Sequence, residues 1–171
     1  MKEKLQQLRL LLLDVDGVLT DGSITYTDTG EQIKSFNAKD GLGLRLLMDA
    51  GIDVGIVTAR TSGALRHRCD NLKINLVFDG IKDKAEAFDT ILQKTGLAAG
   101  QVGYVGDDLI DLPAMTRAGV AFTVADASSD VKNHSDYTAS LPGGHGGVRE
   151  ICETILKAQG LWDQILSGFL S

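Results

Sequence analysis

The sequence contains little of what a disulfide-rich or cysteine-metal protein needs. Its 171 residues include two cysteines, Cys69 and Cys152, which lie far apart and in no metal-ligand spacing, so we expect neither a disulfide framework nor a cysteine metal site. Prolines also number two, and no repeat or low-complexity tract is present. A chain of this length buries roughly two thirds of its unfolded surface without covalent help. These features predict a single domain, residues 1–171, in a reducing compartment.

Long hydrophobic runs and an excess of positive charge are absent as well. The first apolar run, Leu8–Leu13, is interrupted by Arg9 and closed by Asp14, far short of the roughly 18 apolar residues of a membrane span. Seventeen basic against 23 acidic side chains give a net charge of −6, which disfavours nucleic acid because its binding depends on clustered Lys and Arg. We therefore expect a cytoplasmic protein that binds neither membrane nor nucleic acid, and any anionic substrate would need a local basic pocket.

Short apolar runs alternate along the chain with longer segments of helical period. The short runs are bounded by Gly or Asp and are typical of buried strands; they are Leu10–Leu13, Asp53–Val57, Leu76–Phe78, Val102–Val105 and Val120–Val124. The segments with helical period are Gly41–Ala50, Ser62–Asn71, Lys84–Lys94 and Asp111–Ala118. This alternation predicts an α/β fold, a doubly wound and mostly parallel sheet with helices on both faces. Ligands of such sheets bind at the carboxyl ends of the strands.

Two segments depart from this alternation. Residues 23–37 contain two alternating stretches around Asp28-Thr29-Gly30 and predict a projecting β-hairpin. Residues 141–147, LPGGHGG, predict a glycine-dense loop before a helix that ends at Ala158 and a last amphipathic segment, Leu161–Leu170. The apolar side chains of that last segment recur at helical spacing, so we expect it to pack on its own domain or on a neighbour.

Polar and charged side chains gather where the predicted strands end. In chain order they are Asp14 and Asp16, Thr58 and Arg60, Lys82 and Lys84, and Asp107, Asp108 and Asp111. Period two places Asp14 and Asp16 on one face, and two acids in one crevice need a cation or a proton between them. Oxygen ligands, a hydroxyl and cations at one sheet edge predict a hard-metal phosphate site.

Each of these residues alone has an ordinary structural explanation. Thr58, Asp108 or Asp111 could serve as a helix cap or first-turn residue, and a lysine after a strand is usually a solvated surface charge. The ordered set at successive strand ends favours a site over chance assembly.

Four motifs resemble those of the haloacid dehalogenase superfamily. They are DVDGVLTDG at 14–22, Thr58, Lys84 and GDDLID at 106–111. The resemblance implies phosphoryl transfer to Asp14 as the nucleophile, with Asp16 as the acid that protonates the leaving oxygen and then activates water. Because a halide leaves without a proton whereas an ester oxygen needs one, Asp16 favours a phosphatase over a dehalogenase.

The same resemblance implies how a metal and the phosphate are held. Mg²⁺ would lie between the Asp14 carboxylate, the Asp16 main-chain carbonyl and Asp107, and would cancel the repulsion between carboxylate and phosphate. Thr58 and Lys84 would hold the transferred oxygens. Two further acids would support Lys84 or the metal's waters; they are Asp108 and Asp111.

Further stretches resemble a family of sugar-acid phosphatases within this superfamily. They are FNAKDGLGLRLL at 36–47, GDDLIDLPAM at 106–115, and GGHGGVRE through ILKAQG at 143–160. The short intervals on either side of Thr58 leave no room for a cap domain. The resemblance implies hydrolysis of 3-deoxy-D-manno-octulosonate 8-phosphate in lipopolysaccharide biosynthesis. It also implies a homotetramer whose hairpins meet at the centre and whose glycine-rich tails can reach active sites.

Five side chains are expected to contact the substrate: Lys39, Thr58, Arg60, Lys84 and Arg149. Lys39 stands where this family often has Arg, and a lysine holds a carboxylate differently from an arginine fork. His145 stands at a tail position often held by Arg or Lys, and a solvent-facing loop histidine is an equal alternative for it. Arg149 could equally be a surface residue at a helix start.

The hairpin can be interpreted either as an ordinary structural excursion or as a surface for association. It could be an ordinary edge excursion, but its apolar side chains, Ile24, Tyr26, Ile33 and Phe36, would then leave apolar surface and a strand edge exposed. Association of several copies is therefore favoured.

Three other functions are alternatives that we weigh against the sequence motifs. A phosphatase of a nine-carbon, sialic-acid-type 9-phosphate would show most of the same motifs. A signalling receiver domain also uses aspartates, Thr, Lys and Mg²⁺, but the order of its motifs along the chain differs and it needs no acid at Asp16. A non-catalytic binding relative is disfavoured by the intact set of motif residues.

Overall fold

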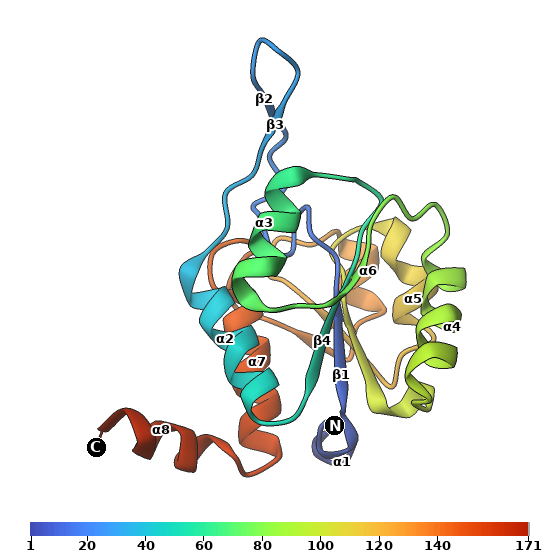
Figure 1. Cartoon of the computed structure of the whole chain (residues 1–171). Helices are drawn as coiled ribbons and strands as arrows, with labels where there is room; N and C mark the ends of the chain where they lie inside the picture. Colours follow the sequence, from blue (N-terminus) through green and yellow to red (C-terminus); the bar gives the residue numbers. More distant parts are fainter. Residues whose placement is uncertain (171) are drawn as a thin grey trace.

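The structure is a computed structural model that describes residues 1–170, and a six-stranded parallel sheet lies at its centre (Figure 1). Its strands are β1 (Leu10–Leu13), β4 (Asp53–Val57), β5 (Leu76–Phe78), β6 (Val102–Val105), β7 (Val120–Thr123) and β8 (Tyr137–Thr138). The strand order is β5-β4-β1-β6-β7-β8. The chain order reverses at β1, so the carboxyl ends of β4, β1 and β6 meet at the switch point where such sheets bind ligands. The predicted α/β fold is thus confirmed.

The side chains of β1 alternate between two cores. Leu11 and Leu13 pack in the core beneath α2 (Ala38–Asp49), α3 (Gly63–Leu72) and α7 (Gly147–Ala158). Leu10 and Leu12 pack in the other core with side chains of α4 (Lys84–Thr95) and α5 (Leu112–Met115). Figure 1 shows α2 and α7 on one side of β1 and α4 and α5 on the other. A strand covered on both faces explains the uninterrupted run of leucines.

Helix boundaries follow the capping side chains. The Asn37 side chain accepts hydrogen bonds from the N–H groups of Lys39 and Asp40, so α2 begins three residues before the predicted Gly41. Ser62 and Asp83 cap α3 and α4 in the same way.

The predicted helix Asp111–Ala118 is wrong in length. The chain forms a 3₁₀ turn, η2 (Leu109–Asp111), followed by the short α5 (Leu112–Met115). The Asp111 carboxylate accepts two N–H groups of the preceding loop, which tightens this turn. Four short elements escaped prediction because they are too brief for periodicity to reveal; they are α1 (Lys2–Gln7), η1 (Ala99–Gln101), α6 (Ser129–Asn133) and β8.

Two segments project from the body of the molecule at opposite ends (Figure 1). The first is the predicted hairpin, formed by antiparallel β2 (Thr25–Tyr26) and β3 (Gln32–Ile33). The second is α8 (Trp162–Leu170), whose Trp162 packs near the charged ends of Arg149 and Lys157.

The intervals between the motifs contain no cap domain within residues 1–170. The hairpin and α2 lie between β1 and β4, and α3 and β5 lie between β4 and α4. None of the helices that the structure describes has the length and hydrophobicity that a membrane crossing requires.

Candidate active site

A cleft of about 280 Å³ opens at the carboxyl ends of β1, β4 and β6. Most of its polar lining was predicted from the sequence; these residues are Asp14, Asp16, Thr58, Arg60, Asp107 and Asp108. Ile24 of the hairpin stem and Ile110 add apolar walls. The parallel topology therefore brings side chains from three separate strand ends into one site.

A buried lysine joins two of the aspartates beneath the cleft. The Lys84 Nζ lies 2.8 Å from Asp14 Oδ1 and 2.6 Å from Asp111 Oδ1, and all three side chains are buried. Burial alone would lower the pKa of Lys84, but the two carboxylates outweigh burial and raise it. Lys84 thus stays charged and fixes one oxygen of Asp14.

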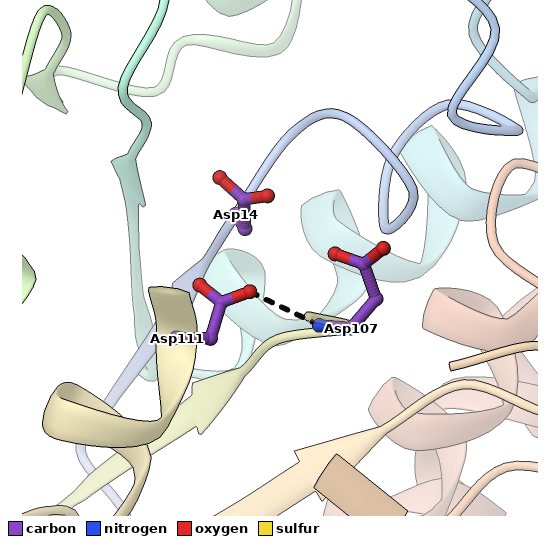
Figure 2. A group of neighbouring side chains, drawn as sticks. All are labelled: Asp14, Asp107 and Asp111. Carbon is purple, nitrogen blue, oxygen red and sulfur yellow. Dashed lines mark hydrogen bonds between the residues drawn. The ribbon is translucent and has the colours of Figure 1, made fainter. Parts of the chain in front are cut away.

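Both carboxylate oxygens of Asp111 already have two hydrogen-bond partners each. Its Oδ1 also accepts the Tyr104 hydroxyl at 3.0 Å. Its Oδ2 accepts the N–H groups of Asp107 at 3.1 Å (Figure 2) and of Asp108 at 3.3 Å. This arrangement suits Asp111 to support Lys84 and the loop after β6 rather than to bind a metal.

Asp14 and Asp107 have the properties of metal ligands. Carboxylate oxygens of Asp14, Asp107 and Asp111 lie within 4.8 Å of one another (Figure 2). Burial raises the pKa of Asp14 to about 6, although Lys84 opposes the shift. Burial and the neighbouring carboxylates raise the pKa of Asp107 to about 7. Both shifts indicate negative charge that is insufficiently compensated.

One oxygen of Asp107 is left without a partner. Its Oδ1 is buried and receives no hydrogen bond from the described residues, an arrangement that costs free energy unless a ligand completes it. The neighbouring Gly17, with φ of +94°, makes room for this carboxylate, because a Cβ there would lie 2.0 Å from Asp107 Oδ2. Oxygen donors with excess negative charge fit a hard divalent cation such as Mg²⁺.

Asp16 lines the same cleft but has different partners. Its Oδ1 forms an ion pair with Lys34 Nζ, and its Oδ2 lies 3.8 Å from Arg60 Nε. Its side chain is partly exposed to the cleft. The structure thus places the two predicted reacting carboxylates in one cleft and pairs them with separate cations.

Thr58 and Arg60 offer donors to an anion in the cleft. Thr58 is buried, and its hydroxyl accepts the N–H of Arg60 at 3.4 Å. Within residues 1–170 no acceptor takes the hydroxyl proton of Thr58, which is thus available to a phosphate oxygen. The half-exposed Arg60 side chain reaches the Tyr26 hydroxyl of the hairpin at 3.5 Å. Asp108 caps the η2 turn through Leu109 N–H at 2.8 Å while facing the cleft.

Four residues considered from the sequence lie outside the cleft of the described chain. Lys39 is exposed in the first turn of α2, and Arg149 on α7 pairs with Glu153 at 2.8 Å. Lys82 is exposed, and the His145 Nδ1 lies 2.8 Å from the carbonyl of Gly143 in its own loop. Substrate contact by Lys39 and Arg149 stays a prediction.

Two residues of the site were missed from the sequence. Tyr104 donates to Asp111 from inside β6, and the signal for it was a hydroxyl in a strand otherwise apolar. Lys34 reaches Asp16 from the hairpin, and its only sequence signal was a lysine between two apolar hairpin residues, Ile33 and Phe36.

Comparison with known proteins gives consistent matches. Residues 24–125 match the family described as haloacid dehalogenase-like hydrolase. The chain is 46% identical over 160 residues to the 3-deoxy-D-manno-octulosonate 8-phosphate phosphatase KdsC of Haemophilus influenzae, covering 94% of this chain and 89% of that protein.

Solved structures of similar phosphatases superpose on the whole fold. The 3-deoxy-D-manno-octulosonate 8-phosphate phosphatase of Yersinia pestis matches with a TM-score of 0.93 and 40% identity, covering 95% of this chain and 88% of that one. The Moraxella catarrhalis phosphatase, in complex with magnesium ion, phosphate ion and KDO, matches with a TM-score of 0.96 and 38% identity, covering 98% and 97%.

Proposed function

The chain belongs to the haloacid dehalogenase-like hydrolase family, and on this premise we propose that it hydrolyses 3-deoxy-D-manno-octulosonate 8-phosphate to the sugar acid and phosphate. The reaction makes it a Mg²⁺-dependent phosphoric monoester hydrolase. The observation that carries the proposal is the pair of cleft carboxylates, Asp14 held by Lys84 and Asp16 held apart from it. The similar Moraxella phosphatase contains the metal, phosphate and sugar acid that this reaction involves.

The geometry suits a two-step displacement through Asp14. Since Lys84 binds Oδ1 of Asp14, Oδ2 is the oxygen left to attack phosphorus. This step requires the protonated form of Asp16: as the bond to Asp14 forms and the bond to the sugar oxygen breaks, Asp16 transfers its proton to the departing oxygen and becomes a carboxylate. Asp16 then removes a proton from water, which attacks the aspartyl-phosphate, releases phosphate and restores Asp14.

The remaining cleft residues hold the phosphoryl group and its charge. The Thr58 hydroxyl and Lys84 donate to the phosphoryl oxygens. Mg²⁺, held by Asp14, Asp107 and the Asp16 carbonyl, would neutralise the charge that otherwise repels a phosphate dianion from Asp14. Asp108 and Asp111 support this arrangement, and Arg60 lies at the mouth of the cleft where the sugar acid enters.

The assembly and setting of the protein are part of the proposal. The exposed hairpin residues Ile24, Tyr26 and Ile33 support association into a homotetramer, in which Lys39 and Arg149 would contact substrate in the cleft of another copy. The enzyme would act as a single-domain cytoplasmic phosphatase in the synthesis of the eight-carbon sugar acid of lipopolysaccharide.

The proposal is tested by substrate preference. Phosphate release in the presence of Mg²⁺ is measured for octulosonate 8-phosphate, a nine-carbon nononate 9-phosphate and an aryl phosphate, with Asp14→Asn as the inactive control. We expect the highest kcat/KM for the eight-carbon substrate. Preference for the nine-carbon acid would keep the mechanism and replace the substrate, whereas no release from any of them would indicate a binding protein.

A further inference from the structure

Lys34, the residue that directly follows β3 of the hairpin, turns its side chain back toward the Asp16 carboxylate. Its neighbour Ile33 is 52% exposed, whereas the side chain of Lys34 is 3% exposed. A lysine is rarely buried unless its charge is paired. The partner here is Asp16, the proposed acid and base.

Neither of the other cations near the cleft can replace Lys34 as the anchor of Asp16. Lys84 is already shared between Asp14 and Asp111. Arg60 lies 3.8 Å from Asp16 and has a side chain that is 46% exposed, so solvent weakens its hold on the carboxylate. The buried ammonium of Lys34 therefore decides where this carboxylate lies.

We propose that Lys34 is a positioning residue that holds the Asp16 carboxylate at the cleft for both of its proton transfers. The inference rests on the proposed function, because it assigns Lys34 a part in that reaction. A general acid or base must first be within hydrogen-bond reach of its proton, and small displacements of a reacting group are costly. The ion pair also links the hairpin to the loop after β1, which we call the catalytic loop because it contains Asp14 and Asp16. The position of the hairpin therefore affects the position of Asp16.

The test compares Lys34 variants in the full-length protein with Mg²⁺. Lys34→Met keeps the length of the side chain and removes its charge, Lys34→Arg restores a charge, and Asp28→Asn changes a charge at an exposed position of the same hairpin. Since general acid–base catalysis contributes about 10²–10⁴-fold, we expect Lys34→Met to lower kcat at least about tenfold with KM within about twofold. Lys34→Arg should recover part of the loss, and Asp28→Asn should match the wild type.

A double-mutant cycle with Asp16→Asn separates positioning from a structural role. If Lys34 acts through Asp16, Lys34→Met should change kcat by less than about twofold once Asp16 is replaced. A full loss in both backgrounds, or a change in KM alone, would overturn the inference. Circular dichroism and the mass in solution verify that the variants fold and assemble.

Assays on two substrates distinguish an error in the role of Lys34 from an error in the proposed substrate. Every variant is assayed on octulosonate 8-phosphate and on an aryl phosphate. A wild-type enzyme active only on the aryl phosphate would contradict the proposed substrate and still allow the cycle to be measured. A wild-type enzyme active on both, combined with an unimpaired Lys34→Met, would contradict the role of Lys34 alone.

Discussion

Five aspartates follow β1 and β6, and four of them have partners that give each a different capacity. Asp111 accepts four hydrogen bonds, Asp14 shares Lys84, and Asp16 pairs with Lys34. Asp107 alone among them retains a buried oxygen without a partner. In the proposed reaction, metal binding therefore falls to Asp107 together with the Asp14 carboxylate, proton transfer to Asp16, and support to Asp111.

The stability of the metal-free protein should decrease as pH rises from about 4 to 7. Folding raises the pKa of Asp14 from 3.8 to about 6 and that of Asp107 from 3.8 to about 7. In this window the unfolded chain has lost protons that the folded chain retains, so the contribution of these groups to stability falls with increasing pH. Mg²⁺ takes the place of these protons, and the rise in Tm on adding Mg²⁺ should be larger at pH 8 than at pH 5.

Thermal unfolding at both pH values, with and without Mg²⁺, measures this difference. Asp107→Asn removes one of the two groups and should reduce both the pH dependence and the Mg²⁺ effect. An equal rise in Tm at pH 5 and pH 8 would argue against the assignment of Asp107 as a metal ligand.

Removing the charge of Lys84 should be costly to both folding and activity. Lys84→Met leaves Asp14 and Asp111 buried as unpaired neighbouring charges, which is expected to cost about 3–5 kcal/mol of unfolding free energy. Lys82→Met is the matched control, because Lys82 is exposed two residues away and should change stability by less than about 0.5 kcal/mol. Urea unfolding at neutral pH without Mg²⁺ measures both, and similar stabilities for the two variants would contradict a buried ion network.

At the scale of elements, the glycine-dense tail loop lies against the catalytic loop that follows β1. Gly144 donates its N–H to the Val18 carbonyl at 3.0 Å, and the Asn37 side chain donates to the Gly144 carbonyl at 3.2 Å. A Cβ at Gly143 would lie 1.8 Å from the carbonyl oxygen of Gly17. The loop thus holds the backbone beside Asp16 in its own chain.

A side chain at Gly143 should therefore disturb metal binding as well as folding. In Gly143→Ala the added methyl must displace the backbone of the catalytic loop, at a cost of about 1–3 kcal/mol in stability. The Mg²⁺ concentration needed for half-maximal activity should rise. Gly100→Ala provides the control, because a Cβ at Gly100 would have no neighbouring atom within 4 Å. An unchanged Mg²⁺ activation curve in Gly143→Ala would contradict a role of the tail loop in metal binding.

The elements also show where prediction from sequence succeeds and where it stops. β1 and β6 match their predicted bounds, because a short apolar run closed by Asp or Gly is typical of a strand that a parallel sheet buries on both faces. The aspartates were placed together because parallel strands end at one edge. Lys34 and Gly143 were not placed, because their contacts depend on the path of a hairpin and a loop in space, which periodicity does not encode.

At the scale of the whole molecule, apolar side chains remain exposed on both projecting segments. Tyr26 and Ile33 of the hairpin are 55% and 52% exposed, and Phe169 and Leu170 of α8 are 66% and 78% exposed. The hairpin stem also lines the cleft through Ile24. Association through the hairpin would therefore cover apolar surface and the mouth of the cleft together, whereas association through α8 would leave the cleft open.

Charged substitutions on the two segments should distinguish these modes of association. We expect the wild-type protein to have the mass of a tetramer by light scattering. Tyr26→Asp with Ile33→Asp should dissociate it, because each buries a charge in an apolar interface, and Phe169→Asp with Leu170→Asp should leave its mass unchanged. If a second copy completes the cleft, the dissociated hairpin variant should also lose kcat/KM for the sugar acid while its activity on a small aryl phosphate changes less. A wild-type monomer at micromolar concentration would contradict assembly through the hairpin and would require Lys39 and Arg149 to act elsewhere than on the substrate.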